Sequence, residues 1–230
     1  MPDVGDKSLL VLAIDTCGPA GSVALGRVFG PETNPAVEVL GEVELEGKTY
    51  SARLVAAVGE LLGDQDVKLG DVGCAVAVGG PGSFTGVRVG LSAVKGLAMS
   101  AGMPVVAVSR LEVLAAKAGT DAAALDAHRG EVFLRVGERE LLAGAEELAA
   151  TPAPERVAVC DAAADKLLRA AWTEAELAEV AAPTASDALR RAARRILAKE
   201  FIGIAMLDGN YLRRPDAEIH FGVPAVERKS

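Results

Sequence analysis

The sequence predicts an α/β protein built from two halves, and two observations carry this prediction. Short apolar runs, typical of buried strands, alternate with longer stretches of helical spacing along the chain. A strand, a turn and a returning strand open each half. A length of 230 residues leaves room for one large or two small domains, and we expect two.

The first half is expected to begin with three strands, from Leu9 to Asp15, from Ser22 to Arg27 and from about Val37 to Leu45. Helical spacing from Tyr50 to Leu62 then predicts a first long helix. The apolar run from Val72 to Val78 predicts a further buried strand.

A turn rich in glycine follows this strand, at residues 79–82, and separates it from a second long helix expected from about Ser83 to Ala101. Val105 to Val108 predicts one more strand.

The second half repeats part of this order, with a strand from Ala123 to Asp126, a turn, and a returning strand from Glu131 to Val136. Asp15 and Asp126 each end an apolar run shortly before a glycine and a new strand, which we interpret as a weak internal repeat. The remaining expected elements are a strand at Val157 to Cys160, a helix at Ala162 to Ala171, and a helix at Asp187 to Lys199 with Ser186 as its N-cap.

The composition is that of a soluble globular chain, because 50% of the residues are hydrophobic and 24% are charged. Disordered, collagenous and coiled-coil classes are thereby excluded. A formal charge of −8 argues against nucleic-acid binding over most of the surface. One Trp, two Tyr and five Phe are too few for rows of base-stacking platforms. Any contact with RNA should therefore be local or indirect.

The three cysteines, Cys17, Cys74 and Cys160, are odd in number and form no CxxC pair, which favours reduced, buried thiols in a cytosol. The apolar run from Ser8 to Ile14 is too short for a membrane span or a signal-peptide core. Glycines interrupt the uncharged stretch from Val72 to Val87. We therefore expect a cytoplasmic protein with no membrane partner.

Two interpretations stay open for the glycine-rich turn together with the start of the helix behind it, residues 79–86. It follows a buried strand and opens a helix, where free backbone N–H groups and the helix dipole can hold a phosphate. No Gly-Lys-Ser/Thr of a P-loop follows, and Thr85 stands where the dinucleotide pattern needs its third glycine. A tight turn capped by Ser83 explains the same residues.

The two strand-end carboxylates also have two explanations. Asp15, with Thr16 beside it, and Asp126 from the other half could hold a metal-bound phosphate between the halves. Alternatively, both carboxylates cap turns by accepting hydrogen bonds from backbone N–H groups. The two histidines, His128 and His220, cannot form an HExxH pair or a credible Ser-His-Asp relay, so we expect surface histidines, no catalytic residue and no metal site.

The two long helices carry few charges, with Arg53 and Glu60 in the first and Arg88 and Lys95 in the second. In both helices the charges are seven residues apart and share one stripe, so the rest of the helix surface is apolar or small. Either the other half covers the surplus apolar face or, as we favour, another subunit does. The side chains that we assign to this interface are Tyr50, Leu54, Val58, Leu62, Val87, Leu91 and Val94.

One basic patch stands out on the acidic chain, in the helix expected from Asp187 to Lys199. Its arginines either form a solvated face paired with local carboxylates or contact RNA or an acidic partner. They are Arg190, Arg191, Arg194 and Arg195.

Four blocks of sequence resemble the TsaB family, also called YeaZ, in the order of that family and across nearly the whole chain. They are Leu12 to Thr16, Gly79 to Gly90 with Lys95 to Ala98, Asp126 to Ala127 with Gly130 to Phe133, and Tyr211 to Arg213. The resemblance implies two ribonuclease-H-like halves, as in actin, Hsp70 and sugar kinases. We expect residues 1–104 to carry the partner-binding helices, and the smaller half, 105–230, to return its helix near 187–199 to the first.

The resemblance further implies a non-catalytic subunit in the formation of threonylcarbamoyladenosine at position 37 of tRNA. Members of this family bind and stabilise the TsaD paralogue through the two long helices, with the ATPase TsaE joining the assembly, and form homodimers when alone. Contact with tRNA is then indirect. Many relatives begin the first long helix with a histidine where this chain has Tyr50, so contacts there are expected to differ.

No cofactor is required on this interpretation, although ATP or ADP could lie at the partner interface. A vestigial nucleotide site would consist of Asp15, Thr16, Gly80, Gly82 and Asp126. The older family label of glycoprotease, or M22-like peptidase, finds no support without a histidine pair. The alternative function is a small-molecule kinase or ATPase that uses Asp15 and Asp126.

Overall fold

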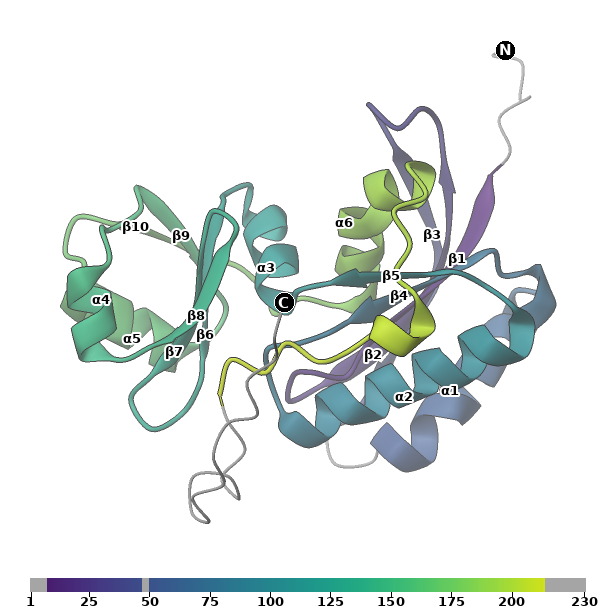
Figure 1. The fold of residues 1–230 in the computed structure, drawn as a ribbon, viewed down its shortest axis with the longest axis horizontal. Coiled ribbons are helices and arrows are strands. Elements are labelled where there is room, and N and C mark those ends of the chain that lie inside the picture. Colours follow the sequence, from purple (N-terminus) through teal and green to yellow (C-terminus); the bar gives the residue numbers. More distant parts are fainter. Residues whose placement is uncertain (1–7, 47–49, 214–230) are drawn as a thin grey trace.

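The computed structural model describes residues 8–46 and 50–213 and contains two α/β lobes that lie side by side (Figure 1). Each lobe is built on a sheet of five strands. The first sheet has the order β3-β2-β1-β4-β5, in which β1 is antiparallel to β2 and parallel to β4. Its strands are β1 (Leu9–Asp15), β2 (Gly21–Phe29), β3 (Ala36–Leu45), β4 (Cys74–Val78) and β5 (Val105–Val108).

The second sheet repeats this topology, with the order β10-β9-β6-β7-β8. Its central strand β6 is antiparallel to β7 and parallel to β9, as β1 is to β2 and β4. The internal repeat predicted from two aspartates is therefore present in the strand order. The strands are β6 (Ala122–Asp126), β7 (Val132–Val136), β8 (Arg139–Ala143), β9 (Arg156–Val159) and β10 (Glu176–Glu179).

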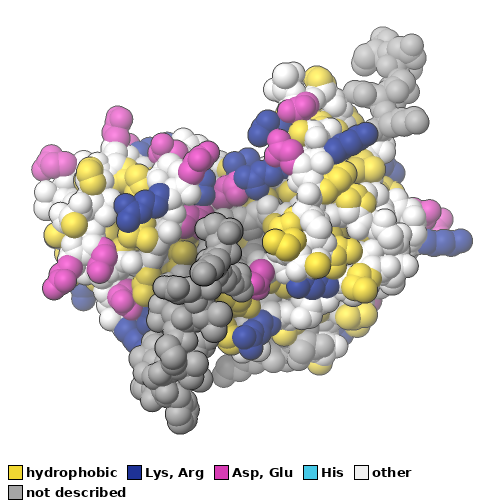
Figure 2. All heavy atoms as spheres, viewed as in Figure 1, with side chains coloured by type: hydrophobic (Ala, Val, Ile, Leu, Met, Phe, Trp, Pro, Cys, Tyr) yellow, Lys and Arg dark blue, Asp and Glu magenta, His cyan; other side chains and the backbone are white. Residues whose placement is uncertain are grey.

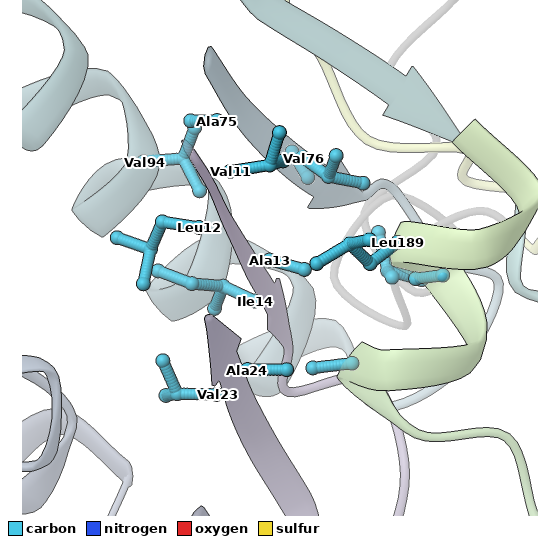
Figure 3. Packing of buried hydrophobic residues seen from close by; sticks show 14 of the residues in the cluster. Val11, Leu12, Ala13, Ile14, Val23, Ala24, Ala75, Val76, Val94 and Leu189 are labelled. Carbon is cyan, nitrogen blue, oxygen red and sulfur yellow. The ribbon is translucent and has the colours of Figure 1, made fainter. Parts of the chain in front are cut away.

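Helices cover both faces of the first sheet. α1 (Tyr50–Asp64) and α2 (Phe84–Ala101) pack on one face, and α6 (Ala185–Leu197) packs on the other, mainly against β1 and β2 (Figure 1). Figure 3 shows the consequence for β1: Leu12 and Ile14 point toward α2, while Ala13 points toward Leu189 of α6. The strand is apolar on both faces because both faces are buried.

The first lobe therefore does not end at residue 104, the boundary expected from the sequence. β5 forms its fifth strand, and α6 returns to it from beyond the second sheet. The second lobe keeps α4 (Ala145–Ala150) and α5 (Ala162–Ala171), whereas α3 (Arg110–Ala118) contacts both the second sheet and α6. Two short 3₁₀ turns, η1 (Leu69–Asp71) and η2 (Ile204–Met206), complete the described part.

The N-terminus of α6 is fastened to the first sheet by side-chain hydrogen bonds. The N–H of Ala185 donates to Oγ of Ser22 at 2.7 Å, and the N–H of Ser186 donates to Oε1 of Glu42 at 2.8 Å. The N-cap is Thr184, not Ser186 as predicted, because Asp187 accepts the N–H of Thr184 at 3.1 Å and so begins the helix two residues earlier.

Candidate functional site

The carboxylate of Asp15 caps the turn that follows β1, residues 16–20, which we call the Asp15 turn. Its Oδ1 accepts the N–H of Cys17 at 2.8 Å, and the residue is 2% exposed. The hydroxyl of Thr16 donates to the backbone oxygen of Gly86 at 2.6 Å and so ties the same turn to α2. Both predicted site residues are thus engaged in holding the turn against the second long helix.

The glycine-rich turn is packed tightly against the Asp15 turn. Ser83 caps α2, since its Oγ accepts the N–H of Gly86 at 3.3 Å, and the N–H of Ser83 donates to the oxygen of Cys17 at 2.8 Å. A Cβ on Gly82 would overlap that same oxygen, and Gly80 has a φ of 99°, which favours glycine. The turn thus serves as a capped strand-to-helix connection that packs directly against the Asp15 turn.

Asp126 adopts the same geometry in the second lobe. Its Oδ1 accepts the N–H of His128 at 2.8 Å, and its Oδ2 lies 2.8 Å from Nδ1 of the same histidine. The two strand-end carboxylates therefore both cap turns by accepting backbone N–H groups, the second of the two explanations that their sequence positions allow. Of the five residues predicted for a vestigial nucleotide site, Asp15, Thr16 and Asp126 make hydrogen bonds within the chain. Gly80 and Gly82 lie in the tight turn before α2, and the nucleotide site stays a prediction.

No group of three or more His, Cys, Asp or Glu side chains that could bind a metal occurs among the described residues. His128 is an exposed residue of the β6–β7 turn, whereas His220 lies outside the described residues. Within the same part of the chain, no helix has the length and apolar character needed to cross a membrane.

The side chains assigned to a partner interface do not face outward. Leu54, Val58 and Leu62 of α1, and Val87, Leu91 and Val94 of α2, are all buried in the core of the first lobe. The larger apolar residues of each helix turn toward the sheet because the sheet offers the nearest apolar surface. Tyr50 begins α1, but its side chain lies outside the described residues.

The outward faces of α1 and α2 are formed by other residues. Val55 is 63% exposed and Met99 is 71% exposed. The remaining outward positions are mostly small, and Figure 2 shows hydrophobic side chains over the part of the first lobe where α2 lies. Arg53 and Glu60, predicted to share one stripe, form an ion pair at 3.4 Å. The small exposed residues are Ala52, Ala56, Gly59, Gly63, Ser92, Gly96 and Ser100.

The arginines of α6 are paired with carboxylates. Arg191 and Arg195 both contact Oε1 of Glu112, at 2.5 and 2.6 Å. Nη1 of Arg190 lies 3.6 Å from Oδ1 of Asp187, and Nη1 of Arg194 lies 3.4 Å from Oε1 of Glu32. This arrangement agrees with the predicted solvated face with local partners, and not with an array of free phosphate-binding cations.

Sequence reasoning missed α3 and with it two charged residues that the fold buries, Arg110 and Glu112. A signal was present, because Ser109 and Glu112 have the spacing of a capping box. The structure shows this box: the N–H of Leu111 donates to Oγ of Ser109 at 3.2 Å, and the N–H of Ser109 donates to Glu112 at 3.4 Å.

The three cysteines are free. Burial raises the pKa of Cys17 well above its usual value, with the nearby Asp15 carboxylate adding to the effect, and burial raises the pKa of Cys74 to about 12. Burial also raises the pKa of Cys160, which is only half-buried, and the charge of Arg110 opposes that shift.

These environments predict an order of thiol reactivity, because the thiolate is the reactive form. In the native protein at pH 8, Ellman's reagent should modify Cys160 slowly and leave Cys17 and Cys74 unmodified. All three thiols should react after unfolding in guanidinium chloride, and Cys160→Ser should abolish the native signal. Rapid native modification of Cys17 or Cys74 would contradict the described burial.

The two lobes define the class of protein, a pair of ribonuclease-H-like α/β units, because both sheets share one mixed topology. Over the full fold, YeaZ from Pseudomonas aeruginosa is similar with a TM-score of 0.70 and 27% identity, covering 89% of this chain and 100% of that one. A second P. aeruginosa structure, described as an uncharacterized protein with similarity to peptidase YeaZ, has a TM-score of 0.69 and 28% identity, with the same coverage.

Residues 42–158 match the family of the tRNA N6-adenosine threonylcarbamoyltransferase TsaD. The chain belongs to this family, within its TsaB (YeaZ) branch. The tRNA threonylcarbamoyladenosine biosynthesis protein TsaB of Bacillus subtilis is 38% identical over 129 residues, which are 54% of this chain and 53% of that protein. TsaB of Escherichia coli K12 is 35% identical over 136 residues, 56% and 55% of the two chains. The chain thus spans about half the length of the curated relatives it matches.

Proposed function

We propose that this chain is a non-catalytic TsaB-type subunit that supports threonylcarbamoyladenosine formation in tRNA by binding and stabilising a TsaD paralogue. The names of the B. subtilis and E. coli relatives support the pathway. The occupied turns around Asp15 and Asp126 support a role without chemistry of its own. The ATPase TsaE would join the assembly, and a second copy of the chain would replace the paralogue in its absence.

The observation that carries this proposal is the outward face of α1 and α2. The two helices lie next to each other on one side of the first lobe, and their outward positions combine exposed Val55 and Met99 with alanines and glycines (Figure 1). Small residues allow another helix to approach closely, and an exposed apolar surface is stabilised when a partner removes it from water. The proposed binding surface thus consists of outward side chains, in place of the six predicted side chains of α1 and α2 that are buried in the core.

Replacing Ala56 by arginine should weaken the complex. Ala56 is exposed on the outward face of α1, so a long charged side chain there would keep a partner helix away without disturbing the core. The variant and the wild type would be co-expressed with the cognate TsaD, and complex formation measured by size exclusion and calorimetry. We expect affinity to fall about tenfold or more, equivalent to about 1.4 kcal/mol or more.

Ala170→Arg provides a matched control, since Ala170 is an exposed alanine in helix α5 of the second lobe. Both variants should keep wild-type thermal stability within about 0.5 kcal/mol, as exposed substitutions usually do. Retention of the full complex by Ala56→Arg, or equal loss with Ala170→Arg, would contradict an interface on α1 and α2.

A further inference from the structure

A buried cation lies beside Asp15, at the junction of the two lobes. Arg110 is the first residue of α3 and is 5% exposed. Its Nε lies 3.6 Å from Oδ2 of Asp15, and its backbone N–H donates to the oxygen of Gly80 at 2.7 Å. The guanidinium also contacts Gly18 of the Asp15 turn so closely that a Cβ there would overlap it. Arg110 thus contacts the Asp15 turn through its side chain and the glycine-rich turn through its backbone.

Charge explains why a cation is needed at this position. Asp15 is buried, and an isolated carboxylate in such a place is costly unless a positive charge or hydrogen bonds compensate for it. One of its oxygens accepts the N–H of Cys17, while the other faces Arg110. In proteins that bind metal-bound phosphates, a divalent ion is often the largest local charge. Here the cation belongs to the chain itself.

Asp15 and Arg110 form an ion pair in which the Nε of Arg110 makes no hydrogen bond among the described residues. The side chains of both residues are more than nine-tenths buried. The charge of Arg110 also extends to the second lobe, where it opposes the effect of burial on the Cys160 thiol. The guanidinium of Arg110 thus contacts Asp15 at the end of β1, and its charge acts on Cys160, which follows β9.

The segment that follows η2 closes the same junction from outside. The N–H of Asn210 donates to the oxygen of Gly79 at 2.7 Å, and its Nδ2 donates to Glu140 of β8 at 2.5 Å. Arg213 donates to the oxygen of Ala127 at 2.8 Å and to Glu131. The chain thus bridges the glycine-rich turn of one lobe to the Asp126 turn of the other.

We propose that Arg110 is a built-in counter-ion for Asp15 that occupies the position of a metal-bound phosphate and so prevents metal–nucleotide binding at this junction. Removing the guanidinium leaves Asp15 facing a space shaped for a small cation. That space would bind a free guanidinium ion or a divalent metal ion. The inference concerns the isolated chain and does not depend on the partner complex of the proposed function.

The test compares the wild type with Arg110→Ala in the isolated full chain. We expect Arg110→Ala to lower the Tm by on the order of 10 °C, since one member of a buried ion pair is left alone. Millimolar methylguanidinium chloride should restore part of the loss, or restore folding if the variant does not fold without it. Manganese(II), followed by electron paramagnetic resonance with and without ADP, should bind to the variant and not to the wild type.

Two further variants separate this role from general packing. Arg110→Lys retains a positive charge and should exclude manganese as the wild type does. Asp15→Asn combined with Arg110→Ala removes the carboxylate, and both rescue by methylguanidinium and manganese binding should disappear. The proposal is overturned if Arg110→Ala gains neither methylguanidinium rescue nor manganese binding, or if the wild type binds manganese–ADP in a manner that Asp15→Asn abolishes.

Discussion

Replacing Gly86 by alanine should destabilise the protein by about 3 kcal/mol, because the new methyl group would overlap the backbone oxygen of Thr16. The hydrogen bond from the Thr16 hydroxyl to the oxygen of Gly86 would be disturbed by the same displacement. To relieve the overlap between the methyl group and the Thr16 oxygen, α2 would have to move away from the Asp15 turn. Urea denaturation followed by circular dichroism would measure the change in the free energy of unfolding.

The same substitution at Gly96 should have the opposite sign. Gly96 lies in the same helix, is exposed, and a Cβ there would meet no atom within 4 Å. Alanine reduces the conformational entropy of the unfolded chain, so Gly96→Ala should stabilise the protein by about 0.5–1 kcal/mol. Equal effects at the two glycines would show that the close contact between α2 and the Asp15 turn is not formed.

Replacing Glu112 by alanine should cost about 3–5 kcal/mol, as expected when one partner of a buried ion pair is removed. Glu112 is 5% exposed and faces both Arg191 and Arg195, so the substitution leaves two cations crowded at the α3–α6 contact. Burial already lowers the pKa of Arg191, and the charge of Arg195 adds to that effect while Glu112 opposes it.

Thermal and urea denaturation would measure this loss, with Glu38→Ala as the control. Glu38 pairs with Arg27 at 3.5 Å on an exposed surface, where an ion pair contributes little, so the control should change stability by at most about 0.5 kcal/mol. A loss below about 1 kcal/mol for Glu112→Ala would mean that water or other groups compensate the two arginines.

Local sequence patterns predicted several strands and helices together with their bounds. β1 and β5 have the predicted bounds, and α5 does too. These segments have a continuous apolar run or a clear helical period, so short-range information is sufficient. The elements that the patterns missed, among them β8, β10 and α4, are short and carry mixed residues. Pairing with β7 and β9 stabilises the two strands, and packing against α5 and β8 stabilises the helix.

At the candidate site, too, the sequence predicted the local structure but not the contacts between distant segments. The sequence predicted that Asp15 and Asp126 end strands beside turns, and it left open whether they bind a ligand or cap those turns. Short acidic side chains can do either, and the choice depends on what lies opposite them. The structure places Arg110 opposite Asp15, although the two residues are far apart in the chain.

The sequence by itself determined the α/β class, the repeated strand order and the low charge of the two long helices, because periodicity and composition are local properties. Only the tertiary structure decided which side of each helix faces outward and which residue neutralises Asp15, whereas the return of α6 to the first lobe agrees with the prediction. The physical reason is that burial and charge pairing depend on contacts between segments distant in the chain, and no single segment carries that information.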